Sequence, residues 1–133
     1  IPNCIILHFG INDAYFPVYR SEFKENLVQF IRKARIETNV KEIILPTSQP
    51  FENIYDMQMI EIYYRTIREV AIDLKCILVP LHTIMQSMIL EKTIFIKDII
   101  QNDDRYLNEK GQKLVGKIML KYLKRFFKSE VLC

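Results

Sequence analysis

Residues 10–13, Gly-Ile-Asn-Asp, are the clearest candidates for chemistry in this sequence. They follow directly after the apolar run 4–9, so that a predicted strand delivers an amide and a carboxylate at its end. Polar groups in that place can bind or polarise a ligand at the edge of a sheet. The alternative is a plain turn, because Asn and Asp side chains readily bond to nearby backbone.

The two histidines are the side chains that could act as a base near neutral pH. His8 lies inside the first apolar run, where a core histidine with satisfied hydrogen bonds is the ordinary interpretation. His82 follows the apolar run 76–79 and is the better candidate, although no partner for it is evident. Neither predicts a metal site, because no second His or Cys stands at ligand spacing.

Several other classes of function find no support. The three glycines, Gly10, Gly111 and Gly116, form no dinucleotide fingerprint, and there is no phosphate-binding loop, so we expect no cofactor. A net charge of +3 is too small to indicate nucleic acid as a partner. No apolar run is long enough for a transmembrane helix.

The start of the chain and its cysteines indicate a soluble protein without a signal peptide. Ile1 is followed by no basic region and no signal-like apolar region. Cys4, Cys76 and Cys133 are odd in number and unpatterned, which argues against a disulfide framework or a zinc site. We therefore expect reduced cysteines, and nothing indicates a compartment.

Short apolar runs alternate with longer segments of helical periodicity along all 133 residues. The pattern predicts strands at 4–9, 42–45 and 76–79. It predicts helices after an N-cap at Ser21, over 56–74, over 83–89, and after an N-cap at Asn108. The residues expected on the buried faces are Phe23, Leu27, Phe30, Ile31, Ala34, Tyr63, Ile67, Val70, Ala71, Leu74, Leu114, Ile118, Met119, Tyr122 and Phe126. This alternation is typical of a parallel sheet with helices on both faces, where ligands bind beyond the carboxyl ends of the strands.

Two segments resemble blocks of the SGNH (GDSL-type) hydrolases. PNCIILHFGIND, residues 2–13, is similar to the third block, a strand that ends in Gly-x-Asn-Asp. DDRYLNEKGQKLVG, residues 103–116, is similar to the fifth, Asp-x-x-His followed by Leu-Asn-x-x-Gly and a helix. The resemblance covers almost the whole chain. It implies a three-layer α/β/α fold with a flavodoxin-like parallel sheet that lacks the first strands of the family fold. Residues 1–133 would then be one domain, the C-terminal part of that fold.

The resemblance also implies an activity, the hydrolysis of carboxylic or acyl esters by a serine nucleophile. Asn12 would donate to the oxyanion, a task suited to a neutral, fixed donor, and Gly10 would keep the turn close to the substrate. Asp103 falls on the triad aspartate and Tyr106 on the histidine. A phenol with an ordinary pKa of about 10 cannot inherit the role of an imidazole base, which leaves His82 as a weak substitute.

The serine and glycine blocks of the family are not found in this sequence, so whether the chain is an enzyme stays open. One hypothesis is an SGNH-like esterase whose 133 residues are inactive by themselves. The alternative is a non-catalytic remnant that serves as a structural or interaction subunit. In either case the strand 4–9 would have lost its neighbour. We therefore expect a missing N-terminal segment or a partner chain to pair with it.

A basic stripe runs along the predicted last helix. Its members recur every three or four residues and are Lys110, Lys113, Lys117, Lys121, Lys124 and Lys128. A solvated face is the ordinary interpretation of such a run, and an acidic partner or an anionic membrane surface is the alternative.

Overall fold

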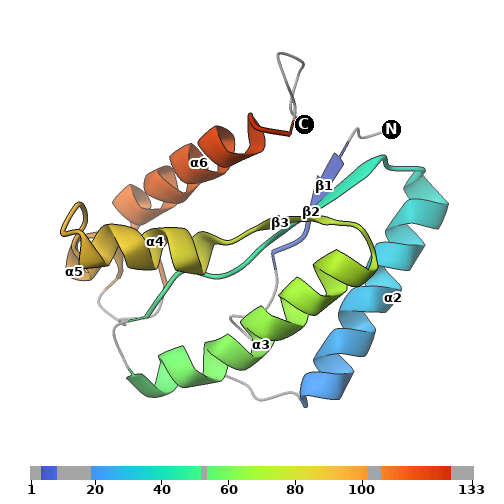
Figure 1. Ribbon diagram of the computed structural model, residues 1–133, viewed down its shortest axis with the longest axis horizontal. Coiled ribbons are helices and arrows are strands. Elements are labelled where there is room, and N and C mark those ends of the chain that lie inside the picture. Colours follow the sequence, from blue (N-terminus) through green and yellow to red (C-terminus); the bar gives the residue numbers. More distant parts are fainter. Residues whose placement is uncertain (1–3, 9–18, 52–53, 102–105, 127–133) are drawn as a thin grey trace.

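The computed structural model describes residues 4–8, 19–51, 54–101 and 106–126 (Figure 1). Strands and helices alternate along the chain as the periodicity predicts. In order they are β1 (Cys4–Ile6), α2 (Arg20–Thr38), β2 (Glu42–Pro46), α3 (Ile54–Asp73), β3 (Ile77–Val79), α4 (Leu81–Leu90), α5 (Ile96–Ile99) and α6 (Glu109–Leu123).

The three strands form a parallel sheet in the order β1-β2-β3. Ile5 pairs with Ile43 in the first ladder, and Leu45 pairs with Leu78 in the second. Two backbone bonds continue the ladders beyond these strands, Leu7 N to Ile44 O at 2.9 Å and Thr47 N to Val79 O at 3.0 Å. The predicted parallel α/β fold is confirmed.

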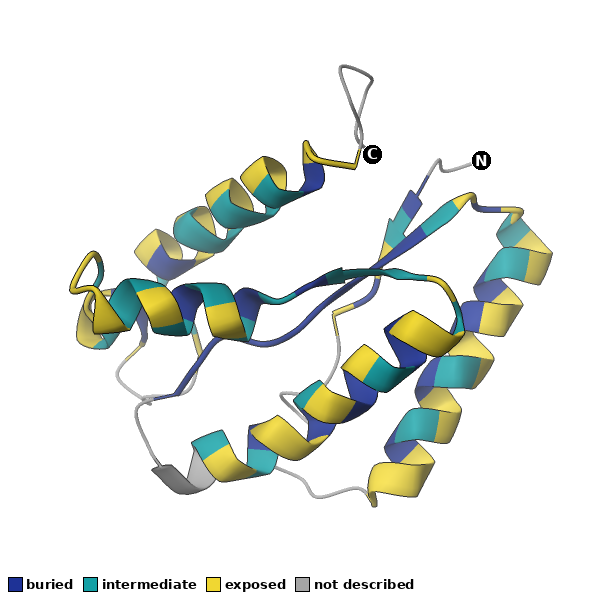
Figure 2. Cartoon of the chain, in the orientation of Figure 1, coloured by how far each residue is buried: buried dark blue, intermediate teal, exposed yellow. Residues whose placement is uncertain are grey.

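The sheet lies between two helical layers (Figures 1 and 2). Side chains alternate along a strand, so Ile43 and Leu45 of β2 pack with α2 and α3, while Ile44 packs with α6 on the opposite face. All three are at most 1% exposed, as expected for a parallel strand covered on both faces. The predicted three-layer architecture is thus confirmed.

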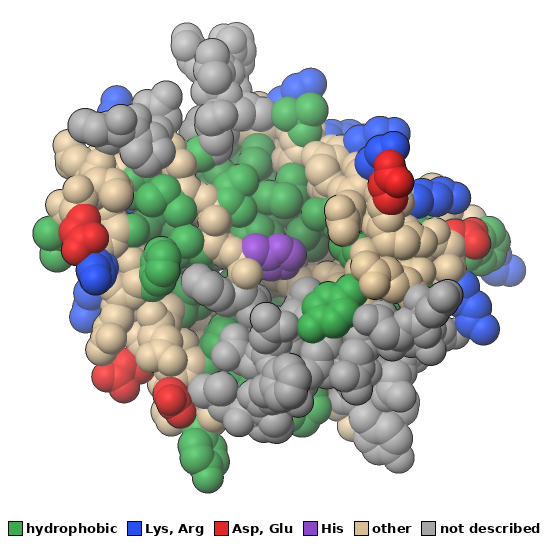
Figure 3. All heavy atoms as spheres, turned by 180° about the vertical axis from the view of Figure 1, so that it is seen from behind, with side chains coloured by type: hydrophobic (Ala, Val, Ile, Leu, Met, Phe, Trp, Pro, Cys, Tyr) green, Lys and Arg blue, Asp and Glu red, His purple; other side chains and the backbone are tan. Residues whose placement is uncertain are grey.

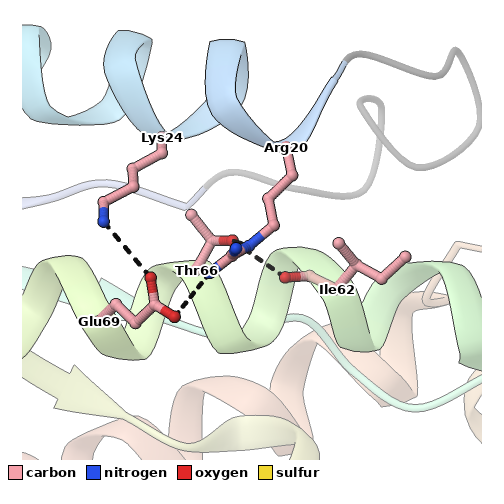
Figure 4. Close-up of polar contacts among 5 residues, drawn as sticks. All are labelled: Arg20, Lys24, Ile62, Thr66 and Glu69. Carbon is pink, nitrogen blue, oxygen red and sulfur yellow. Dashed lines mark hydrogen bonds and ion pairs between the residues drawn. The ribbon is translucent and has the colours of Figure 1, made fainter.

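The two helices on the first face are held together by an aromatic contact and by a polar cluster, and Figure 4 shows the polar cluster. The rings of Phe23 and Tyr63 meet edge to face, with centroids 4.8 Å apart. Arg20 donates from Nε to Thr66 Oγ1 at 3.0 Å and from Nη2 to Glu69 at 2.6 Å, and Lys24 also reaches Glu69 at 3.4 Å. Exposed ion pairs of this kind contribute about 0–1 kcal/mol, but Thr66 is fully buried and fixes the position of Arg20.

The start of α2 is one correction to the predicted boundaries. Helix α2 begins at Arg20 with Tyr19 at the N-cap, so Ser21 lies inside the helix and is not its cap. The predicted cap of α6 is confirmed, because Asn108 Oδ1 accepts a hydrogen bond from Gly111 N at 2.9 Å. Among the other elements, β1 ends at Ile6, earlier than the predicted strand 4–9, and α3 and α4 each begin two residues earlier than predicted. The short helix α5 was not predicted at all.

The predicted buried faces of α2 and α3 hold except at their margins, whereas the predicted stripe of α6 is only half-buried, at Leu114, Ile118, Met119 and Tyr122. Phe23, Leu27, Ile31, Ala34, Tyr63, Ile67, Val70 and Ala71 are buried, whereas Phe30 and Phe126 are 50% and 52% exposed. Phe30 stands beside the stripe that faces α3, and Phe126 lies beyond the end of α6. Helical spacing alone does not distinguish the middle of a buried face from its margin.

The cysteines differ from one another. Cys4 is disulfide-bonded, so the expectation of reduced cysteines is wrong for this residue. Cys76 is a free, half-buried thiol. Burial raises the pKa of the Cys76 thiol, and the neighbouring Arg35 guanidinium, 3.8 Å from Sγ, opposes that rise.

No helix in the described part of the chain is both long and apolar enough to cross a membrane.

The first turn of α6 gives a test of this packing. A Cβ on Gly111 would lie 2.2 Å from Ile99 O and 2.9 Å from Leu107 Cδ2, whereas a Cβ on Gly116 would meet nothing within 4 Å. We predict that Gly111→Ala lowers the free energy of unfolding by about 1–3 kcal/mol through overpacking. Gly116→Ala is the matched control and should raise it by about 0.5–1 kcal/mol through helix propensity. Urea denaturation measures both, and equal effects at the two positions would contradict the contact.

Candidate functional site

The carboxyl ends of the three parallel strands meet at one edge of the sheet, where ligands bind in folds of this kind. His8 follows β1, Thr47 follows β2 and His82 follows β3 through Pro80 and Leu81. The buried Thr47 joins the other two. Its Oγ1 accepts a hydrogen bond from His82 N at 3.0 Å, and its backbone is hydrogen-bonded to the ring of His8.

His8 is not the enclosed core residue that its place in an apolar run suggests. It is exposed, and its neighbours nevertheless desolvate the ring enough to lower its pKa, against the opposing effect of the bond to Thr47. Figure 3 shows histidine at the centre of the rear face, beside an area of hydrophobic side chains. A neutral imidazole thus lies at the surface of the predicted ligand edge.

His82 is more enclosed. Its ring lies against Tyr64 with centroids 5.5 Å apart, and Tyr64 OH is 2.9 Å from Thr83 Oγ1. Burial lowers the pKa of His82, while the charge of Glu61 raises it to a lesser extent. Its Nε2 is buried and has no hydrogen-bond partner among the described residues. The ring is therefore a neutral imidazole, but in this arrangement solvent does not reach the nitrogen that a base would use.

The polar residues that follow β2 lie at this same edge of the sheet, and the sequence did not predict their burial. Thr47, Ser48 and Gln49 are at most 4% exposed. Ser48 Oγ donates to Gln49 O at 3.3 Å, which does not suit a nucleophile. Three polar residues directly after an apolar strand were the signal available in the sequence.

The site residues implied by the resemblance are only partly within the described chain. Gly10, Asn12 and Asp103 lie outside the described residues. Tyr106 lies inside them and is 38% exposed. Its carbonyl accepts a hydrogen bond from Gln101 N at 2.7 Å, next to the bridge between Ile100 and Leu107. The end of this loop is therefore fixed to the short helix α5.

Asn108 strengthens the same attachment. Its Nδ2 donates to Asp98 O at 3.0 Å and to Ile100 O at 3.2 Å, while its Oδ1 caps α6. One side chain thus connects α5 to the start of α6. As for metals, the described residues contain no group of three His, Cys, Asp or Glu side chains that could hold an ion.

Known structures show which proteins share this fold. Over 92% of its length the chain matches the lipase/acylhydrolase from Enterococcus faecalis, with a TM-score of 0.70 and 21% identity. Over 90% it matches a catalytic mutant of an acetylxylan esterase from Geobacillus stearothermophilus (TM-score 0.73, 20% identity). It likewise matches LAE5, an α/β hydrolase from the metagenome of Lake Arreo, Spain, over 90% (TM-score 0.71, 22% identity).

The chain therefore shares its α/β fold with these three proteins. The chain spans 62%, 58% and 59% of the length of these three proteins, in the same order. No protein-family model matches the chain, and no curated protein sequence is significantly similar to it.

Stability as a function of pH tests the environment of His82. In the folded chain the pKa of His82 is lower than the ordinary value near 6.5. As the pH falls below 6.5, the unfolded chain therefore binds a proton at this residue more readily than the folded chain does. We predict that His82 contributes nothing to the pH dependence of the free energy of unfolding above about pH 7. That free energy should fall as the pH drops below about 6.5, by at most about 1.4 kcal/mol per pH unit for one histidine.

Urea denaturation between pH 5 and pH 8 measures this slope. His82→Gln should make it shallower, because the substituted side chain does not titrate. Lys41→Gln, an exposed change elsewhere, should keep the wild-type slope. An unchanged slope in His82→Gln would show that folding does not lower the pKa of His82.

Proposed function

We propose that residues 1–133 form the C-terminal part of an SGNH-type ester hydrolase domain. The observation that carries the proposal is the shared fold with an acylhydrolase and an acetylxylan esterase, combined with Gly-Ile-Asn-Asp shortly after β1. The spacing at the other end adds support. Catalytic mutants of that esterase replace an aspartate and a histidine three positions further on, the spacing of Asp103 and Tyr106 in this chain.

In the proposed reaction a serine attacks the carbonyl carbon of an ester, and the alcohol leaves as the tetrahedral intermediate collapses. Water then releases the acid from the acyl-enzyme. Asn12 donates its amide to the oxyanion, Gly10 leaves room for the substrate, and Asp103 occupies the place of the triad carboxylate. The serine comes from a complementary segment.

The edge of the sheet supports that complementary segment. Among the described residues β1 pairs with β2 alone. Leu7 N bonds to β2, and successive N–H groups of a strand point to opposite edges, so the N–H of Ile6 faces the other side. Ile6 itself is 46% exposed. An edge of this kind is a template for a further strand, supplied by an N-terminal segment or by a partner chain.

Tyr106 favours the second candidate function, a non-catalytic subunit of the same fold. A phenol accepts a proton poorly at neutral pH, and the unpartnered nitrogen of His82 is buried. A chain that has kept the fold and Asn12 without a base suits a structural or interaction role.

The activity of the isolated chain is the first test. We predict only background hydrolysis of short-chain p-nitrophenyl esters, because loss of a triad member typically costs several powers of ten in rate. Turnover well above background that disappears in His82→Ala would contradict the prediction and identify His82 as the base.

The Tyr106→His variant separates the two candidates in a protein that also carries a serine-bearing segment. A gain of about 100-fold or more supports the hydrolase, since a general base contributes about 10²–10⁴ in rate. No gain, with unchanged circular dichroism, supports the non-catalytic subunit.

The free edge gives a separate prediction. The isolated chain should associate through β1, and light scattering should show species larger than a monomer. Ile6→Lys places a charge at this edge and should shift the chain toward monomer. Ile36→Lys is the control, because Ile36 is 83% exposed on α2 and should leave association unchanged. A monodisperse wild-type monomer in which the amide of Ile6 is strongly protected from hydrogen exchange would refute the open edge, whereas protection at Leu7 is expected in either case because Leu7 N bonds to β2.

A further inference from the structure

A groove runs along α6 on the side that faces α4 and the turn at residues 93–95. It consists of two hollows of about 810 and 510 Å³, and both are lined by Thr93, Leu114 and Lys117. The shared lining shows that the two hollows adjoin, and we call them together the groove. Their lining residues on α6 run from Glu109 to Tyr122, over about 20 Å at a rise of 1.5 Å per residue.

The floor of the second hollow is apolar. Ile84 and Met88 contribute to it from α4, and Leu114, Ile118 and Tyr122 contribute from α6. Each of these side chains is half-buried, so part of its apolar surface still contacts solvent. A partner that covered this floor would gain by burying it.

A row of cations borders the groove. Lys117, Lys121 and Arg125 line the second hollow, and Lys113 lines the first. The spacing of four residues places successive lysines of this row about 6 Å apart along the axis of α6. Lys113 is 3.2 Å from Glu109, whereas the ammonium groups of Lys117 and Lys121 form no ion pair with any described residue. Among the described residues that line the second hollow, Glu91 is the one carboxylate, against three cations.

We propose that this groove binds an acidic amphipathic helix of a partner protein. Such a helix carries apolar side chains for the floor, and its glutamates at positions i and i+4 repeat with the same 6 Å spacing as the cations. A single small anion uses one cation and leaves the rest of the row without a partner. A flat anionic membrane contacts protruding side chains, whereas the apolar side chains here lie in a recess.

A synthetic helix provides the probe. We would use a fluorescein-labelled 18-residue peptide with leucines on one face and glutamates at every fourth position beside them, and measure fluorescence anisotropy with the full chain. Saturable binding is expected. The double variant Lys117→Glu/Lys121→Glu should weaken it at least tenfold. Lys41→Glu/Lys124→Glu makes the same change of net charge at exposed residues outside the groove lining, and should change it less than twofold.

Two further measurements make the proposal falsifiable. A peptide with the same glutamates but serines in place of leucines should bind at least tenfold more weakly, and equal binding would show unspecific charge attraction. An equal loss of peptide binding in both double variants would likewise show unspecific charge attraction. Absence of peptide binding, together with binding to phosphatidylglycerol vesicles that depends on Lys117 and Lys121, would overturn the proposal in favour of a membrane surface. Circular dichroism confirms that each variant is folded.

Discussion

Burial of β2 on both faces is the constraint on which the rest of this structure depends. The side chains of Ile43, Ile44 and Leu45 are at most 1% exposed, so helices must cover both faces of the strand. The strand order follows the chain order, and right-handed crossovers then place α2 and α3 on the same face. The opposite face is left for α6, whose Val115, Ile118 and Met119 pack onto Ile44 and Val79.

The end of the same strand organises the candidate site. Thr47 continues the β2–β3 ladder by one backbone bond, and its side chain then holds the start of α4 through His82 N. Both histidines are therefore fixed by a residue that belongs to neither of their elements. Their lowered pKa values share one cause, the loss of water around an imidazole at the margin of an apolar core.

Periodicity was sufficient for the strands, the longer helices and the layers, because a buried stripe or a buried run is a property of local sequence. It failed where contacts distant in sequence matter. Helix α2 begins at Arg20, whose side chain bonds to Thr66, 46 residues later, and local sequence does not show this contact. The burial of the polar residues after β2 was not predicted for a similar reason, since a turn motif does not show what covers it. The sequence predicts His8 to be a core residue. Its actual exposure depends on which strands flank β1, and local sequence does not show this. Asn12, Gly10 and Asp103 remain predictions from the resemblance alone.

The strands lie in the sheet in the same order as in the chain, and this order affects how the fold can be assembled. A strand added beside β1 changes neither of the described strand pairs, because both described ladders lie on the other side of β1. The described sheet is therefore divisible at this edge, in the way that permits fragment complementation. A second polypeptide that supplied the further strand would join along one ladder, and its supply would then set the amount of complete domain.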